Sequence, residues 1–362
     1  MPIQMIGTRR SGSNLLRVMI GQLPEVYAPQ STHMLEYFMP LVPFYGDLSD
    51  DDNFTVLLND LCHCVELNPV EWTGVELDRD EVFENCKSNT ILSAFEAIYS
   101  IAAKQNNNST WMCKCLGYIN YFDEMQDYFG GNLKYIYIHR DGRDVALSFS
   151  KALAGHKHHY FIAKEWANTQ RLALKIRSML PADKFHTVCY ESLLQDPETT
   201  CKNIAEFIGV PYTSKMLDYH ESNLARSSAK SSNLWGNITK PIITNNSKKY
   251  LKNTSTEDLM IFELVAGDVL DALGYERHYI NQVKGIEFSK NLIDAFELID
   301  NERKESILNT ANPDDVKRRE IQKVYVDSVK QRLGCTDINY HGNMLHKSSV
   351  KTGNQRLELS TH

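Results

Sequence analysis

The first twenty residues constrain the fold more than any other part of the chain. Residues 3–6, Ile-Gln-Met-Ile, predict a short strand, and residues 13–20 predict an amphipathic helix. The loop between them reads Gly7-Thr8-Arg9-Arg10-Ser11-Gly12-Ser13-Asn14. In a strand, glycine-bounded loop and helix of this order, backbone N–H groups and the positive end of the helix dipole face an anion. The sequence therefore predicts an anion-binding loop.

This loop differs from a phosphate-binding P-loop in a respect that bears on its ligand. It keeps the Gly-x4-Gly span but lacks the Gly-Lys-Ser/Thr ending that grips a magnesium-bound nucleotide. Ser13 stands where the lysine would be, and the positive charges come earlier, at Arg9 and Arg10. The loop therefore predicts a nucleotide whose reacting group is not a magnesium-bound phosphate.

Charge and hydropathy exclude several classes of protein. A net charge of −7 over 362 residues argues against a nucleic-acid binder, which needs an excess of cations. No apolar stretch reaches the ~18 residues that a transmembrane helix needs. The N-terminus lacks the basic and apolar regions of a secretory signal. We therefore expect a cytoplasmic protein.

Cysteine spacing raises the question of a metal site. Cys-His-Cys at residues 62–64 and Cys-Lys-Cys at residues 113–115 place two thiols close together. The second pair, however, falls in an apolar segment that predicts a buried strand, where cysteine serves as a small core residue. In a reducing compartment, free thiols are the expected state of all eight cysteines. The sequence therefore predicts no metal site.

The order of the predicted elements indicates the fold class. Apolar strands at residues 111–116, 133–138 and 185–190 alternate with helical patterns. This alternation predicts an α/β fold with a central parallel sheet flanked by helices.

The character of the chain changes in its later part. A Ser-, Asn- and Lys-rich stretch at residues 220–253 predicts a long loop. After a capped amphipathic helix, the sequence becomes charged and helical. We therefore expect one domain over residues 1–276 and a helical extension over residues 277–362, whose last ~25 residues predict a disordered tail.

A second anion site is predicted at the end of the strand near residue 138. The strand runs to Arg140, a helix opens directly behind it, and Ser148 follows two turns later. An arginine at the carboxyl end of a parallel strand lies where doubly wound sheets bind ligands. The competing interpretation is that Arg140 forms an ion pair with Asp144 at the start of that helix.

Together, the two segments resemble the sulfotransferases that use 3′-phosphoadenosine 5′-phosphosulfate (PAPS). In that family, a Lys/Arg-Ser-Gly-Thr/Ser core binds the 5′-phosphosulfate, and an Arg with a Ser eight residues later binds the 3′-phosphate. Arg10-Ser11-Gly12-Ser13 and the pair Arg140 and Ser148 match both parts. The resemblance covers residues 1–276. It implies a P-loop-like sulfotransferase fold of the bacterial type, with PAPS as donor and 3′-phosphoadenosine 5′-phosphate (PAP) as product.

Two weaker similarities extend the implied donor site. Tyr190, before Asp196-Pro197, looks like the family's tyrosine beside the adenine. Lys240 resembles a lysine in a late Lys-Pro turn that reaches the nucleotide. The donor-binding residues that the resemblance implies are Arg9, Arg10, Ser11, Gly12, Ser13, Asn14, Arg140, Ser148, Tyr190 and Lys240.

The resemblance also narrows the choice of general base. The cytosolic aryl and steroid branch takes its base from a Lys-Thr-His sequence, but this chain has Lys-Cys-Leu at residues 114–116. Bacterial and Golgi-type members place the base after the first helix, where this chain has His33 and Glu36. An imidazole with a pKa near ~6.5 suits the role, whereas a carboxylate needs burial to raise its pKa. We expect His33 to be the base, with Glu36 as the alternative, and Arg10 to stabilise the leaving phosphate.

The expected function is sulfuryl transfer from PAPS to a hydroxyl of a small-molecule acceptor, without a metal. Apolar residues between positions 34 and 45 are suited to line an acceptor pocket and favour a lipid or sterol-like alcohol, although core packing explains them equally well. The alternatives are a P-loop kinase of a small molecule and a nucleotide-binding protein without catalysis.

Overall fold

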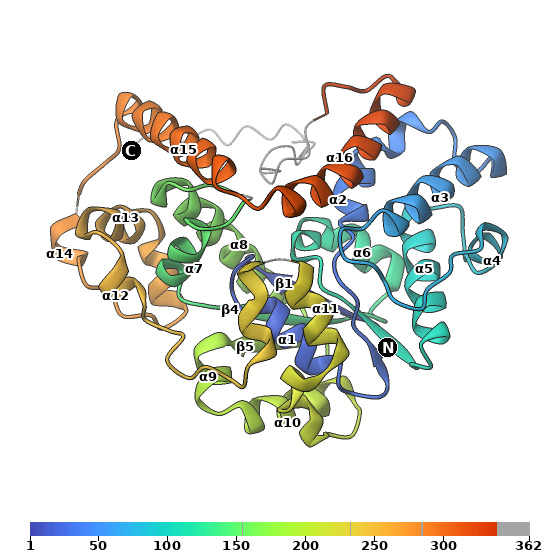
Figure 1. Cartoon of the computed structure of the whole chain (residues 1–362), viewed down its shortest axis with the longest axis horizontal. Helices are drawn as coiled ribbons and strands as arrows, with labels where there is room; N and C mark the ends of the chain where they lie inside the picture. Colours follow the sequence, from blue (N-terminus) through green and yellow to red (C-terminus); the bar gives the residue numbers. More distant parts are fainter. Residues whose placement is uncertain (154, 232, 284, 339–362) are drawn as a thin grey trace, which may run out of the picture.

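The computed structural model describes residues 1–153, 155–231, 233–283 and 285–338, and the predicted disordered tail lies outside them. Its centre is a five-stranded sheet in the order β2-β3-β1-β4-β5 (Figure 1). The strands are β1 (Ile3–Gly7), β2 (Val26–Tyr27), β3 (Thr110–Cys113), β4 (Lys134–His139) and β5 (Phe185–Cys189). All four strand pairings are parallel, which confirms the predicted α/β class.

Helices connect and cover the strands on both faces of the sheet (Figure 1). The α-helices are α1 (Ser13–Ile20), α2 (Met34–Phe38), α3 (Asp51–Glu66), α4 (Arg79–Glu84), α5 (Ile91–Gln105), α6 (Phe122–Phe129), α7 (Gly142–Phe149), α8 (His159–Met179), α9 (Tyr190–Gln195), α10 (Pro197–Ile208), α11 (Asn223–Ser231), α12 (Tyr250–Asn253), α13 (Thr256–Ala272), α14 (Ile280–Val283), α15 (Lys290–Asn309) and α16 (Pro313–Leu333). Short 3-10 helices are η1 (Met39–Phe44), η2 (Leu116–Tyr121), η3 (Ser214–Met216), η4 (Tyr219–Glu221) and η5 (Asn233–Thr239).

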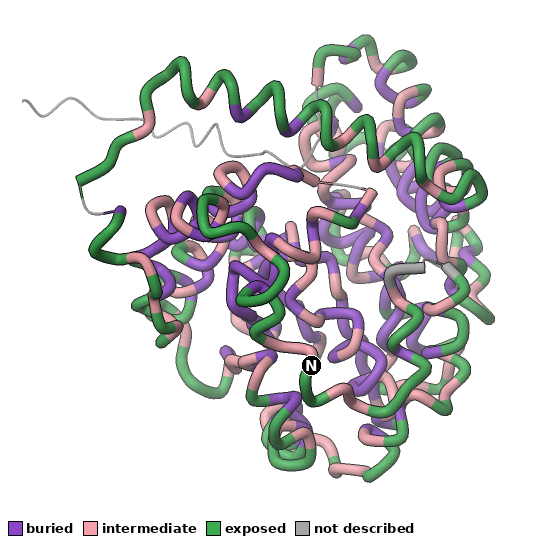
Figure 2. Tube along the Cα trace, turned by 60° about the vertical axis from the view of Figure 1, so that its left-hand side comes forward, coloured by how far each residue is buried: buried purple, intermediate pink, exposed green. Residues whose placement is uncertain are grey.

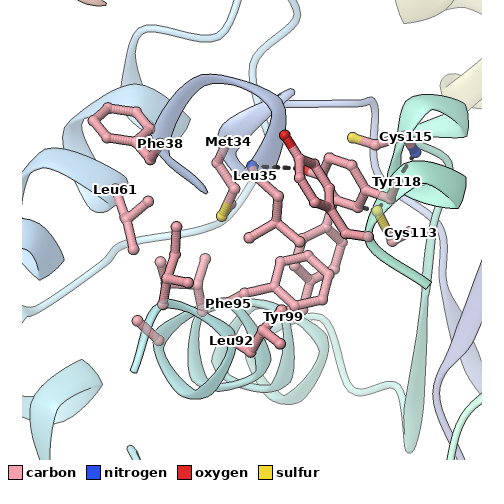
Figure 3. Packing of buried hydrophobic residues seen from close by; sticks show 14 of the residues in the cluster. Met34, Leu35, Phe38, Leu61, Leu92, Phe95, Tyr99, Cys113, Cys115 and Tyr118 are labelled. Atoms are coloured by element: carbon pink, nitrogen blue, oxygen red, sulfur yellow. Dashed lines mark hydrogen bonds between the residues drawn. The ribbon is translucent and has the colours of Figure 1, made fainter. Parts of the chain in front are cut away.

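The alternation of side chains along the central strands separates two hydrophobic cores. Ile136 and Ile138 of β4 face the core formed with α1 and α10. Tyr135 and Tyr137 face the opposite core, formed with α2, α3 and α5. Part of this second core is drawn in Figure 3, where Cys113 and Cys115 lie among its apolar side chains. Figure 2 shows buried residues in the interior and exposed residues along the outer helices.

Register aligns the ends of the central strands. Gly7 at the end of β1 lies opposite Ile138 of β4. A Cβ atom on Gly7 would lie 2.2 Å from the Ile138 carbonyl oxygen, and its φ is +140°, so only glycine fits there. The loop after β1 and the residues after β4 therefore leave the sheet side by side.

The stretch at residues 220–253 is not the long loop that its composition predicts. It contains α11, η5 and α12. Ala225 of α11 is buried, and Ser228 accepts a hydrogen bond from the buried guanidinium of Arg17 (2.6 Å). Tertiary contacts thus stabilise short helices that a polar sequence does not indicate.

The C-terminal helices α15 and α16 form two arms of a V over the main body of the molecule (Figure 1). Asp300 of α15 accepts hydrogen bonds from His156 Nδ1 and the His158 backbone N–H, both at 2.8 Å. Val326 and Val329 of α16 are buried in the core that contains α3. Of the helices in the described part of the chain, none is long and apolar enough to span a membrane.

Candidate active site

A cavity of about 1660 Å³ opens at the carboxyl edge of the sheet. Its lining includes the loop after β1, Arg140 after β4 and Tyr190 after β5. These strands are neighbours and parallel, so their carboxyl ends meet at one edge, where doubly wound sheets bind ligands. The structure therefore brings both predicted anion sites into one cavity.

The loop after β1 has an unusual backbone. Arg10 adopts a left-handed conformation with φ of 72°, and Gly12 follows with φ of 90°. A Cβ atom on Gly12 would lie 2.3 Å from Cδ2 of Tyr190, so glycine allows the loop to approach the tyrosine ring. Left-handed conformations of non-glycine residues cost about 1–3 kcal/mol and concentrate at functional sites.

Polar groups at this loop remain available to a ligand. Helix α1 starts at Ser13 without a side-chain cap and without an acidic residue in its first turn. The Ser11 Oγ and Asn14 Nδ2 atoms are buried and have no hydrogen-bond partner among the described residues. Because unpaired buried polar groups are costly, Asn14 Nδ2, which belongs to the cavity lining, fits an anionic ligand that accepts a hydrogen bond here, whereas Ser11 is fully buried and is not among the lining residues.

Arg140 and Ser148 lie against the loop. Arg140 donates a hydrogen bond to the Arg10 carbonyl (3.3 Å), and its guanidinium stacks on the Tyr190 ring at 4.5 Å. Arg10 Nε donates to Ser148 Oγ (3.0 Å). The competing ion pair between Arg140 and Asp144 is also present, at 3.5 Å. Arg140 Nε is buried without a partner in the described structure, which leaves one donor of this guanidinium unused.

The remaining implied donor residues differ in their placement. Arg9 lines the cavity and forms an ion pair with Glu165 at 3.5 Å. Lys240 is exposed and is not among the residues that line the cavity; its carbonyl accepts a hydrogen bond from Tyr219 Oη (2.8 Å). Asn246, for which the sequence gives no signal, lines the cavity instead and donates to Tyr190 Oη (2.7 Å).

Lys114 is a cavity residue that sequence reasoning overlooked. It follows β3 and lines the cavity, with Nζ 3.4 Å from Gln30 Oε1. Burial and then the positive charge of Arg17 lower the pKa of Lys114 to about 7. A lysine inside an otherwise apolar segment was the signal that could have identified it.

His33 and Glu36 form a pair that faces the cavity. His33 Nδ1 lies 3.2 Å from Glu36 Oε2, and the His33 side chain remains 36% exposed to the cavity. Burial alone would lower the pKa of His33, but the charge and hydrogen bond of Glu36 outweigh it and raise this pKa. Neutral His33 can donate Nδ1–H to Glu36 and keep Nε2 free to accept a proton. His33 also has a left-handed backbone, with φ of 59°.

Gly117 provides the space for Glu36. A Cβ atom on Gly117 would lie 2.3 Å from Glu36 Oε1. Burial favours a higher pKa for Glu36, but His33 and a hydrogen bond from the Gly117 backbone lower it, so Glu36 is a carboxylate. An ionised Glu36 suits the positioning of His33 better than it suits a general base.

The apolar segment after α1 contributes less to the cavity than its sequence suggests. Met34, Leu35 and Phe38 point into the core and pack against Leu61 and Phe95 (Figure 3). From residues 34–45, the cavity is lined by Glu36 and Tyr37. Met34, Leu35 and Phe38 lie in the core rather than in an acceptor pocket because the helical turn of α2 directs these three residues inward.

The cavity is strongly positive although the chain is negative. Its lining contains eleven Lys and Arg residues against four Asp and Glu residues. The basic residues are Arg9, Arg10, Lys114, Arg140, Lys151, Lys164, Arg171, Lys249, Arg319, Lys323 and Lys330, and the acidic residues are Glu36, Asp144, Glu165 and Asp327. Burial, with the charges of Arg140, Arg319 and Arg9, lowers the pKa of Arg10 to about 10, so Arg10 remains cationic at neutral pH. Such a cavity concentrates anionic ligands.

Comparisons with known proteins bear on the fold and on the family of the chain. No curated protein sequence matches the chain significantly. The fold is similar to that of the sulfotransferase domain from the Synechococcus PCC 7002 olefin synthase, with a TM-score of 0.52 and 19% identity over 76% of this chain and 94% of that domain. A sulfotransferase domain from the curacin biosynthetic pathway aligns with a TM-score of 0.49 and 17% identity over 77% of this chain and 99% of that domain. The model of the sulfotransferase family matches residues 2–214, and the chain therefore belongs to that family.

Proposed function

We propose that this sulfotransferase uses PAPS and transfers its sulfuryl group to a hydroxyl of a small-molecule acceptor. The observation that carries the proposal is the presence of two adjoining anion sites in one cavity. The loop at Arg10 and the uncapped start of α1 suit a 5′-phosphosulfate, and Arg140 with Ser148 suits a 3′-phosphate. Tyr190 offers its ring beside both sites.

The residues then divide the chemistry between them. His33 Nε2 accepts the proton of the acceptor hydroxyl as its oxygen attacks sulfur in line. Glu36 holds the imidazole and stabilises its positive charge. The bond between sulfur and the bridging oxygen breaks, and its electron pair goes to the phosphate of the departing PAP. Arg10 stabilises this negative charge.

The acceptor side of the cavity favours an apolar molecule. Tyr37, Ile119, Phe161 and Leu172 are among the apolar residues that line the cavity. Large apolar side chains favour a lipid or sterol-like alcohol over a sugar.

Calorimetry with purified protein tests the donor. We expect PAP to bind more tightly than adenosine 5′-phosphate (AMP), since only PAP carries the 3′-phosphate. A preference for ATP with magnesium, accompanied by turnover, would instead support the kinase alternative. A second assay supplies ³⁵S-labelled PAPS and a metabolite extract, with products identified by mass spectrometry. PAP binding without any labelled product would favour the non-catalytic alternative.

A further inference from the structure

Helix α16 forms a wall of the cavity, although it lies outside the region matched by the family model. Residues 319, 322, 323, 326, 327 and 330 line the cavity, and their spacing places them on one stripe of the helix.

The helix is anchored beside the proposed base. The buried Gln322 donates from Nε2 to the carbonyl oxygens of Thr32 (3.2 Å) and Cys64 (2.9 Å), and Thr32 immediately precedes His33. Tyr325 Oη donates to Asp60 Oδ1 (2.8 Å). These contacts fix the stripe in place relative to the acceptor side of the cavity.

Arg319 lies one turn before Gln322 and brings a positive charge to this wall. Its Nε lies 3.1 Å from Asp315 Oδ1, but the same carboxylate oxygen also lies 3.9 Å from Arg318. One carboxylate is thus shared between two arginines. Lys323, one turn later, adds a second cation to the stripe.

Each acidic residue of the cavity is paired with a basic residue of the same cavity other than Arg319 or Lys323. Glu36 pairs with His33, Asp144 with Arg140 and Glu165 with Arg9. Asp327, the acidic residue of the α16 stripe, lies 3.9 Å from Lys330.

We propose that Arg319, assisted by Lys323, binds an anionic group on the acceptor, which would then be an amphipathic hydroxylated acid. This inference rests on the proposed function, because it assumes that the donor occupies the sites at Arg10 and Arg140. The hydroxyl then reaches His33 while the acidic group, such as a carboxylate, lies against α16. An apolar body between the two groups contacts the apolar lining.

Calorimetry on the full-length protein saturated with PAP tests this inference. Two matched pairs of probes separate charge from shape: ω-hydroxydodecanoate with dodecanediol, and cholate with its uncharged methyl ester. In at least one pair we expect the acid to bind about 10- to 100-fold more tightly, as a charge-assisted contact allows. Arg319→Ala should abolish the preference. Arg318→Ala, which removes a neighbouring arginine that does not line the cavity, should keep it.

Each outcome bears on a defined claim. A wild-type protein without preference for either acid, or a preference that survives Arg319→Ala, overturns this inference alone. Titration of PAPS against PAP, without acceptor, tests whether the anion is instead the donor's sulfuryl group. If Arg319→Ala weakens PAPS but not PAP, Arg319 contacts the donor, and the inference is also overturned. If PAP itself does not bind in the first titration, the proposed function fails, and the inference fails with it.

Discussion

Replacement of Arg140 by alanine tests the donor site most directly. If its guanidinium binds the 3′-phosphate, Arg140→Ala should weaken PAP binding much more than AMP binding. A charge-assisted hydrogen bond contributes about 1.5–3 kcal/mol, which corresponds to roughly a 10- to 100-fold rise in the Kd of PAP. Loss of the stacking on Tyr190 adds a smaller effect, about 0.5–1 kcal/mol, common to both nucleotides.

The effect of the substitution on protein stability needs a separate control, because Arg140 also faces the buried Asp144. Burial raises the pKa of Asp144 despite the nearby Arg140, and removal of the arginine would raise it further. A carboxyl whose pKa is higher in the folded than in the unfolded protein lowers the free energy of unfolding once the pH exceeds its pKa in the unfolded protein. The single variant should therefore lose thermal stability as the pH rises. The double variant Arg140→Ala/Asp144→Asn removes the carboxylate of Asp144 and with it this pH-dependent loss of stability.

Calorimetry with PAP and AMP should be run on both variants and on Arg79→Ala, which removes a surface arginine paired with Glu66. We expect both Arg140 variants to lose affinity for PAP specifically. Arg79→Ala should bind both nucleotides as the wild type does. Equal losses for PAP and AMP, or an unchanged PAP affinity, would refute the assignment of Arg140.

Further changes test the remaining roles. His33→Ala should lower kcat by roughly 10²- to 10⁴-fold with little effect on PAP affinity, and near-normal turnover would exclude it as base. In the wild type, the rate should rise with pH through a His33 pKa above its ordinary value, and Glu36→Gln should shift this limb to lower pH with a smaller loss of kcat. Gly117→Ala should displace Glu36 and move the pH profile in the same direction, and an unshifted profile would argue against positioning by Glu36. Truncation after Glu276 should retain PAP binding but lose turnover, because α16 lines the cavity next to the proposed base. A folded truncation that cannot bind PAP would show that the domain boundary is wrong.

The sequence indicates that two segments at the carboxyl edge of the sheet meet in one cavity, because the signals for both segments are local. The loop after β1 and the pair Arg140 and Ser148 lie within short segments whose spacing survives folding unchanged. The acceptor side is assembled differently. Met34 and Phe38, for which the sequence left both a pocket and a core position open, belong to the core. Hydrophobicity alone does not tell which side of a short helix faces a cavity.

Contacts between distant segments account for what sequence reasoning missed. Arg319 reaches the cavity because Gln322 bonds to Thr32, a residue 290 positions earlier in the chain. No periodicity or motif reports such a contact. Asn246 and Lys114 are similar cases, because their place in the cavity depends on how the sheet edge and the following segments meet.

The anchoring of α16 also has a consequence for the order in which the protein folds. Its hydrogen bonds to Thr32, Cys64 and Asp60 span 290, 258 and 265 residues. Contacts of such separation form slowly, because closing a long chain segment costs entropy before the contact stabilises it. The donor loop and Arg140 are themselves 130 residues apart, about half of these separations. A doubling of loop length adds only about 0.6 kcal/mol to the cost of closure, so during refolding nucleotide binding should recover slightly before, or together with, the docking of α16.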